Sequence, residues 1–389
     1  MKQAWLVLWL VLTLVAPAAP ARAASAVTIP FDFVDNRVVV HLKLDGKGPY
    51  AFVLDSGAGF TIAPQVVAAL GLTSSDSFSI GGTGPARVRA SRVKIATLTL
   101  GAVTMRDQTF TVLDMDDIRK ASALPAFDGL IGSELFSRYV VRIDYRAHVL
   151  TLTDPAQYAY RGTGTIVPFV FGGGIPRVDA TLDGIAGSFT IDTGDRMDVT
   201  FMEPVIAREH LLEHYSPRVE TITGWGIGGA VTGYIARARD LRMGALDVRD
   251  PLLRLPTVKA GFFTSRRLTG SIGTGVTDRF TVTFDYSRKR LIFEDPASNG
   301  SNAYDRSGLW LNQGTDGFDV AAVAPQSPAA VAGISAGDRV IAVNGIPARE
   351  IPLADVRTWL RAEPGTRVTV TLERAGALTE VPLTLQDLV

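Results

Sequence analysis

The sequence contains no cysteine and only four histidines among its 389 residues. Without cysteine the chain forms no disulfide and offers neither a thiolate metal ligand nor a cysteine nucleophile. His210 and His214 are spaced four apart, but Leu211 follows the first, so the His-Glu-x-x-His zinc pattern is absent and a solvated helix face is favoured. The sequence therefore predicts neither a metal site nor a cofactor.

Charge of one sign is also lacking, because Lys+Arg and Asp+Glu both number 39. A balanced chain is not typical of proteins that depend on nucleic acid as a partner. Hydrophobic residues make up 47% of the sequence, which is enough to build cores. At this length we expect two or three domains.

A long hydrophobic run occurs only at the N-terminus. Lys2 precedes an apolar stretch from Trp5 to Ala16, and Ala21-Arg22-Ala23 follows as a small-x-small cleavage site. The apolar part is shorter than the ~20 residues of a membrane span. We therefore predict a signal peptide over 1–23, cleaved after Ala23, and an exported protein, periplasmic or secreted, with no stable membrane span. The alternative is an uncleaved anchor.

The most informative feature is a repeated tripeptide at the end of an apolar run. Asp55-Ser56-Gly57 recurs as Asp192-Thr193-Gly194, with the two aspartates 137 residues apart. Further landmarks recur in the same order at an offset of 141, namely 129–132 with 270–273, and 140–145 with 281–286. Matching landmarks at nearly constant offset predict a duplicated unit, which we place at 27–155 and 163–296.

Each repeat is rich in short alternating or β-branched runs separated by glycine and proline, which is typical of strands. The runs are 38–44, 92–100, 149–153, 178–182 and 290–293. One helical stretch follows each tripeptide, at 64–70 and at 203–215, and proline near its start is compatible with a helix. The predicted fold is mainly β, with one short helix per repeat.

At these residues the sequence resembles the aspartic proteases. An apolar run that ends in Asp-Ser/Thr-Gly, followed some 75 residues later by a second apolar-Gly element, is the signature of one lobe of that family. The residues after Gly57 are similar to those of retropepsin-like sequences. The presence of two copies of the repeat in one chain is similar to the layout of pepsin. The resemblance covers about 27–296 and implies two pseudo-symmetric β lobes, each supplying one aspartate.

The resemblance implies a role for each residue of the repeat. Asp55 and Asp192 would share one proton and activate a water molecule. The supporting residues are Ser56 and Thr193, whose hydroxyls brace the two turns, and Gly57 and Gly194, which allow close approach of the backbone. The glycine-rich stretches with Gly81, Gly82, Gly226 and Gly228 correspond to flaps over the substrate, or alternatively to plain tight turns.

The second repeat departs from the family where Asp195 follows Gly194, and Ala58 occupies the matching place in the first repeat. An added negative charge would raise the pKa values of the pair, although a solvent-facing turn residue is an equal alternative. The rival hypothesis is therefore a non-catalytic peptide-binding protein with a decayed site. Carboxylates within reach of one water favour the enzyme, and the duplication favours a dyad within one chain over one shared between two chains.

The last part of the sequence, 308–389, follows a predicted flexible linker at 297–307. Its run from Ser327 to Gly345 resembles a bacterial PDZ domain, which implies a small β barrel with two helices, including one at 353–361. Such a domain adds a peptide strand to an exposed edge and captures a carboxylate with backbone N–H groups. The matching peptide-binding residues are Gly308, Leu309, Trp310 and Leu311, and the alternative is that they only fill the core of a scaffold. The expected partners are polypeptides, bound by a tethered domain.

Overall fold

The structure is a computed structural model that describes residues 26–124, 126–294 and 303–389. The predicted signal peptide (1–23) and positions 297–302 of the predicted linker lie outside the described residues. The described part forms four β-sheets with short helices between the strands, which confirms the mainly β fold. Its helices do not include one long and apolar enough to cross a bilayer.

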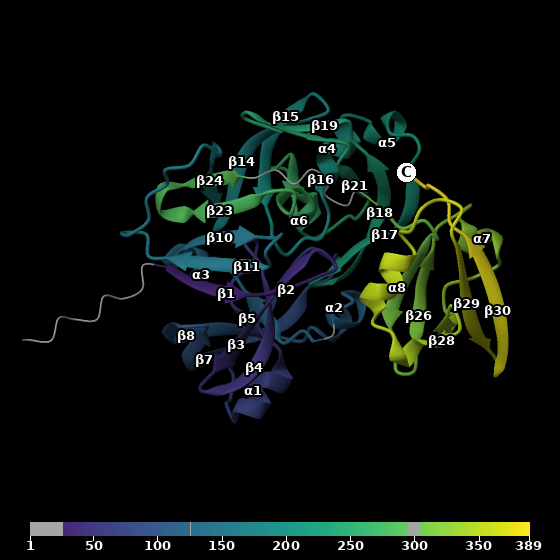
Figure 1. Ribbon diagram of the computed structural model, residues 1–389, viewed down its shortest axis with the longest axis horizontal. Helices are drawn as coiled ribbons and strands as arrows, with labels where there is room; N and C mark the ends of the chain where they lie inside the picture. Colours follow the sequence, from purple (N-terminus) through teal and green to yellow (C-terminus); the bar gives the residue numbers. More distant parts are fainter. Residues whose placement is uncertain (1–25, 125, 295–302) are drawn as a thin grey trace, which may run out of the picture.

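A six-stranded sheet joins the two halves of the molecule (Figure 1). Its order is β1 (Ala26–Pro30), β11 (Val149–Thr153), β10 (Val140–Asp144), β23 (Thr281–Asp285), β24 (Arg290–Glu294) and β12 (Thr165–Pro168). Strands β10 and β23 pair antiparallel at its centre, with Ile143 opposite Val282. These two strands are equivalent landmarks of the sequence repeat, so the two halves meet along their own symmetry-related strands.

Each half adds a lobe sheet of its own. Lobe 1 has the order β2 (Asp32–Val34), β3 (Arg37–Leu44), β4 (Lys47–Leu54), β9 (Gly129–Ile131), β5 (Thr61–Ile62), β8 (Val103–Leu113), β7 (Val88–Leu100) and β6 (Ser75–Ile80). Lobe 2 has β17 (Val219–Gly226), β18 (Gly229–Arg237), β21 (Leu252–Pro256), β16 (Val199–Phe201), β22 (Gly270–Ile272), β15 (Ile185–Ile191), β14 (Ile175–Leu182), β19 (Asp240–Met243) and β20 (Leu246–Arg249), with β13 (Val170–Gly172) beside β14.

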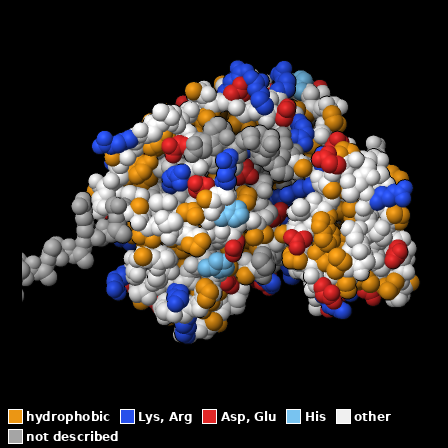
Figure 2. Space-filling model, in the orientation of Figure 1, with side chains coloured by type: hydrophobic (Ala, Val, Ile, Leu, Met, Phe, Trp, Pro, Cys, Tyr) orange, Lys and Arg blue, Asp and Glu red, His pale blue; other side chains and the backbone are white. Residues whose placement is uncertain are grey.

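The C-terminal domain has a separate sheet with the order β25 (Leu309–Gln313), β26 (Phe318–Val323), β27 (Arg339–Val343), β29 (Arg367–Arg374) and β30 (Ala377–Thr384), and β28 (Ile346–Pro347) pairs with β27. Helices α7 (Pro328–Val331) and α8 (Leu353–Trp359) complete it, together with the 3-10 turn η3 (Ala348–Glu350). Figure 2 shows this domain as a bulge beside the two-lobed body, with an indentation between them. Strand β25 forms one edge of its sheet.

The remaining helices are short and lie between strands of the lobes. They are α1 (Pro64–Leu70), α2 (Asp116–Ala121), α3 (Ser133–Arg138), α4 (Glu203–Arg208), α5 (Leu211–His214) and α6 (Thr274–Thr277), with 3-10 turns η1 (Phe262–Thr264) and η2 (Tyr286–Arg288). Helix α1 begins at the proline that the sequence indicated and ends at Gly71, whose φ of +77° needs the left-handed region that glycine tolerates.

Two predictions about helices are wrong. Each lobe holds three α-helices among the described residues, where the sequence predicted one per repeat. The stretch 203–215 forms two helices rather than one, because His210 adopts a left-handed backbone with a φ of 51° and breaks the run between α4 and α5. Its side chain is exposed, in agreement with the predicted solvated position. The predicted strands at 38–44, 92–100, 149–153, 178–182 and 290–293 are all observed, most of them slightly longer.

One continuous core spans both lobes and the joining sheet, while the C-terminal domain has a second apolar cluster. Continuous packing of the two lobes fixes their relative position, because close-packed interiors allow little adjustment. The loops that leave β4 and β15 are therefore held face to face.

Candidate active site

The two repeated aspartates stand at equivalent places in the lobes. Asp55 follows β4, which pairs parallel with β9, and Asp192 follows β15, which pairs parallel with β22. The amide of Asp55 donates to Ile131 O at 2.9 Å, and that of Asp192 donates to Ile272 O at 2.9 Å. The second landmark of each repeat is thus the strand that anchors the aspartate.

A glycine follows each anchor strand, Gly132 after β9 and Gly273 after β22, and close backbone contacts leave no room there for a side chain. A Cβ at Gly132 would lie 2.0 Å from Ala58 O, and one at Gly273 would lie 2.2 Å from Met197 O. Neither distance is possible between real atoms, so only glycine lets the anchor strand approach the loop that carries the aspartate.

Ser56 and Thr193 link the two loops by a symmetric set of hydrogen bonds. The Thr193 amide donates to Ser56 Oγ at 3.1 Å, and the Ser56 amide donates to Thr193 Oγ1 at 2.9 Å. Ser56 Oγ donates to Ile191 O at 2.9 Å, and Thr193 Oγ1 donates to Leu54 O at 2.8 Å. Both side chains are completely buried. Each hydroxyl therefore acts as donor and acceptor across the lobe boundary.

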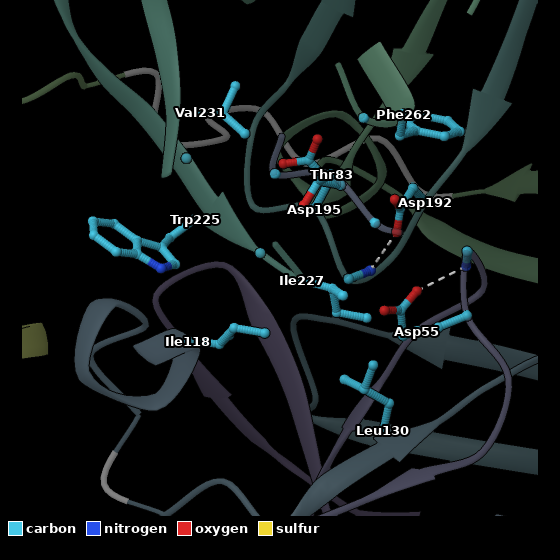
Figure 3. Close-up of a pocket in the computed structure, with 18 of the residues that line it drawn as sticks. Asp55, Thr83, Ile118, Leu130, Asp192, Asp195, Trp225, Ile227, Val231 and Phe262 are labelled. Carbon is cyan, nitrogen blue, oxygen red and sulfur yellow. Dashed lines mark hydrogen bonds between the residues drawn. The ribbon is translucent and has the colours of Figure 1, made fainter. Parts of the chain in front are cut away.

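Gly57 and Gly194 bring each loop against the opposite carboxyl group. A Cβ at Gly57 would lie 2.8 Å from Asp192 Cγ, and one at Gly194 would lie 2.4 Å from Asp55 Cγ. The amide of each glycine donates to the aspartate of its own loop, Gly57 to Asp55 Oδ1 at 2.8 Å and Gly194 to Asp192 Oδ1 at 2.9 Å (Figure 3). Close approach, and not a left-handed backbone, is what these positions require of glycine.

The carboxyl groups of Asp55 and Asp192 interact with each other in a buried setting. Burial raises the pKa of Asp55. Burial, followed by the charge of Asp55, raises the pKa of Asp192 well above its usual range. Two like charges this close do not both ionise readily, so the pair keeps one proton to higher pH than a free carboxylic acid would.

Asp195 adds negative charge to this pair. Its charge raises the pKa values of both Asp55 and Asp192, which is one of the two alternatives that the sequence left open for this residue. It does not face bulk solvent as a plain turn residue would, because Arg254 Nη2 lies 2.6 Å from Asp195 Oδ1 and both side chains are largely buried. Sequence reasoning missed Arg254, since nothing in the pattern of β21 distinguishes an inward-facing arginine.

The pair lies in a cleft of about 890 Å³ between the lobes. Two glycine-rich segments reach it, 81–84 after β6 and 226–229 at the turn from β17 to β18. Residues 81–84 line the cleft, as do Gly226 and Ile227 of the second segment, together with Trp225 and Phe262 (Figure 3). The segments contact each other: the Gly84 amide donates to Ile227 O at 2.9 Å. A Cβ at Gly82 would lie 2.4 Å from Ile227 Cβ, so glycine is needed there.

The predicted flap glycines Gly81, Gly82, Gly226 and Gly228 are thus brought to one place beside the cleft. The Phe262 amide also donates to Gly82 O at 2.8 Å, which ties the first segment to the wall of lobe 2. In this arrangement the two segments are joined to each other at one cleft.

The C-terminal domain packs against the lobes instead of standing apart. Arg357 of α8 donates to Ala121 O of lobe 1 at 2.7 Å and to Asp35 Oδ2 at 2.6 Å. The end of the chain contacts lobe 2, where Val389 packs near Ile235. This domain is therefore docked on both lobes, which the predicted flexible linker did not suggest.

The predicted peptide-binding residues of the C-terminal domain fall in two environments. Leu309 and Leu311 are buried in the domain's apolar cluster, which also includes Ala123 from lobe 1. Helix α2, which precedes Ala123, packs against β25. Gly308 has a φ of +79°, and its amide donates to Asp305 Oδ1 at 2.7 Å. Trp310 instead lines the cleft that holds the two aspartates.

Comparison with known proteins agrees with this architecture. Residues 40–135 match a family model described as aspartyl protease, and residues 320–374 match a model of the PDZ domain. The chain contains an aspartyl protease domain and a C-terminal PDZ domain. The aspartyl protease model covers the first aspartate only, so the second rests on the repeat and on the geometry above.

Relatives of known name match over a short part of the chain. A protein of Agrobacterium fabrum named "Putative zinc metalloprotease" is 42% identical over 64 residues, and one of the same name from Rhizobium meliloti is 39% identical over 67 residues. These segments cover 16% and 17% of both this chain and the relative. An aspartic proteinase from Irpex lacteus matches in structure over 71% of this chain and 100% of its own, with 14% identity and a TM-score of 0.47.

The zinc metalloprotease names raise the question of a metal site. Within the described ranges, no group of three or more His, Asp or Glu side chains is placed to hold a metal ion. The residues that the structure does bring together at the cleft are two carboxyl groups and an acid–arginine pair.

Proposed function

We propose that this protein is an aspartic endopeptidase whose dyad consists of Asp55 and Asp192. The observation that carries this proposal is the reciprocal placement of the two loops, in which each glycine backbone contacts the opposite carboxyl group. A pair held in this way offers one acid and one base on the same face of a cleft. The family match over lobe 1 supports the same assignment.

The proposed chemistry follows from the shared proton. The ionised member of the dyad takes a proton from a bound water, which then attacks the peptide carbonyl carbon while the protonated member donates a hydrogen bond to the carbonyl oxygen. Hydrogen bonds from the Gly57 and Gly194 amides hold both carboxyl groups in fixed orientation. The joined flap segments would exclude bulk water from the reacting bond and would have to open for substrate entry.

The rival function, a peptide-binding protein with a decayed site, is less well supported. A decayed site would be consistent with two turns that lie well apart, whereas hydrogen bonds between Ser56 and Thr193 join the two turns here. Asp195, where this chain departs from the family pattern, forms an ion pair with Arg254, so the additional acid has a partner. We infer from this pairing that Asp195 modifies the acidity of the dyad without abolishing it.

The test is cleavage of an unfolded polypeptide by the purified protein and by its Asp55→Asn and Asp192→Asn variants. We expect both substitutions to abolish cleavage and a chelator to leave the parent activity unchanged. Because ionising a buried acid with a raised pKa destabilises the fold, the Asp192→Asn variant should unfold at the same or higher temperature than the parent at pH 7. Retained cleavage in both variants, or loss of cleavage on chelation, would refute the aspartic assignment.

For the PDZ domain we propose a role in polypeptide recognition at the cleft. Its docked position places Trp310 in the cleft wall, which favours direct participation over a freely tethered module. Any peptide that enters between β25 and α8 would have to displace Ala123, which occupies the apolar cluster there. We further propose export of the protein on the basis of its N-terminal sequence.

A further inference from the structure

A charged cluster joins the PDZ domain to the aspartyl protease domain. We define this junction cluster as Asp35, Arg37, Arg196, Arg357 and Arg361. Its distances to the Asp35 carboxylate are 2.6 Å from Arg357 Nη1, 2.9 Å from Arg196 Nη1, 3.1 Å from Arg37 Nη1 and 3.4 Å from Arg361 Nη2. The Asp35 side chain is 1% exposed. Residues from lobe 1, lobe 2 and the PDZ domain therefore converge on one buried carboxylate.

The junction cluster holds more positive than negative charge. Four guanidinium groups surround one carboxylate, and arginine does not lose its proton in proteins. Two further acids reach the cluster: the charge of Asp305 acts on Arg361, and that of Asp195 acts on Arg37 while its carboxylate is paired with Arg254. Like charges brought this close repel one another, so the site would be more stable with a further anion.

The excess charge is accessible from the cleft. Arg37 and Arg196 both line it, and their side chains are 12% and 18% exposed. Trp310 lines the same wall, with its ring centroid 6.0 Å from the Arg196 guanidinium carbon and 5.6 Å from that of Arg357. Its indole N–H donates to Asn312 Oδ1 at 2.9 Å, which fixes the ring. A flat apolar ring beside two guanidinium groups is a surface for a carboxylate-bearing chain.

We propose that Arg37, Arg196 and Trp310 form a subsite of the cleft that binds a carboxylate of the polypeptide substrate. The carboxylate belongs to an aspartate or glutamate side chain, or to the C-terminus of the substrate. The PDZ domain supplies the aromatic part of this subsite, and its docking through Arg357 assembles it. This inference rests on the proposed function, because it names the substrates that the cleft selects.

The first experiment measures cleavage of peptides of one core sequence. A single glutamate is placed at successive positions on either side of the cleaved bond, and each peptide is matched by its glutamine counterpart. We expect kcat/KM to favour glutamate by about 10-fold at one position, the effect of one charged hydrogen bond. The Arg196→Gln variant should lose this ratio. Because both peptides are tested on the same variant, the ratio is unaffected by a reduced folded fraction.

Two further experiments complete the test. The first distinguishes the two sources of the carboxylate, and the second tests the subsite independently of catalysis. Peptides with a free C-terminus are compared with their amides, and preference for the free acid identifies the terminal group. Binding of the glutamate and glutamine peptides to the Asp55→Asn variant, followed by fluorescence anisotropy, reports on the subsite without catalysis. We expect about 10-fold tighter binding of one carboxylate peptide, lost on adding Arg196→Gln and reduced by Trp310→Ala.

The outcomes are distinct. No cleavage by the parent, together with carboxylate-dependent binding to the Asp55→Asn variant, would refute the enzyme and support the subsite. Equal binding and cleavage of carboxylate and neutral peptides would overturn the subsite. An Arg196→Lys variant that retains part of the preference would support recognition by charge, whereas an unchanged ratio in Arg196→Gln would overturn it.

Discussion

The link between the two loops that carry Asp55 and Asp192 yields a prediction that can be measured without knowing the substrate. Thr193→Val keeps the shape of a completely buried side chain but removes its hydroxyl. Two hydrogen bonds disappear: Thr193 Oγ1 no longer donates to Leu54 O, and the Ser56 amide loses its acceptor. Both groups left without a partner belong to the facing lobe, on residues that are completely buried.

The expected loss follows from those two orphaned groups. Each buried polar group that loses its partner costs about 1–3 kcal/mol, so the two groups together should lower the free energy of unfolding of Thr193→Val by about 2–6 kcal/mol. A valine fills the volume of the threonine, so no cavity adds to this figure. The same change should lower kcat/KM, because the loops that carry Asp55 and Asp192 lose part of their relative alignment.

A matched control is available on the next strand along the chain. Thr200 of β16 is also fully buried, but its hydroxyl has no hydrogen-bond partner among the residues that the structure describes. Replacing an unpaired buried hydroxyl by a methyl group removes a desolvation cost. Thr200→Val should therefore leave the free energy of unfolding unchanged or raise it by up to about 1 kcal/mol.

The assay is urea unfolding of the full chain, followed both by tryptophan fluorescence and by far-UV circular dichroism. If the two probes give the same unfolding transition, one free energy of unfolding describes the whole chain. If they give separate transitions, the change in stability is assigned to the aspartyl protease domain or to the PDZ domain. Equal effects of Thr193→Val and Thr200→Val would refute the reasoning, because the two variants differ only in whether the lost hydroxyl was bonded.

Two further predictions concern the acidity of the dyad and the docked PDZ domain. Asp195→Asn removes a charge that raises the pKa values of Asp55 and Asp192, so both should fall and the high-pH limb of the kcat/KM profile should move to lower pH; an unmoved limb would contradict this. Truncation after 307 removes Trp310 from the cleft and uncovers Ala123, so cleavage of short peptides should fall together with that of long chains, whereas a simple tether predicts that short peptides are spared.

The sequence by itself determined much of how the residues of the candidate site are arranged. The repeated tripeptide and the second landmark of each repeat are local patterns whose backbone geometry follows from a few residues, above all from glycines that allow close approach. Once two such units are recognised, pseudo-symmetry places Asp55 opposite Asp192 and Ser56 opposite Thr193. The sequence also indicated the glycine-rich segments that line the cleft.

Tertiary structure alone decided how the PDZ domain meets the cleft. Arg357 and Asp35 are separated by 322 residues, and Arg196 and Asp35 by 161, so no local pattern connects them. A lone aspartate in a turn and scattered arginines are typical of any solvated surface, and only the packing of three domains buries them together. The position of Trp310 in the cleft wall also depends on the packing of the domains. A residue's chain neighbours indicate the strand to which it belongs, whereas the cleft that its ring faces depends on which surfaces pack together.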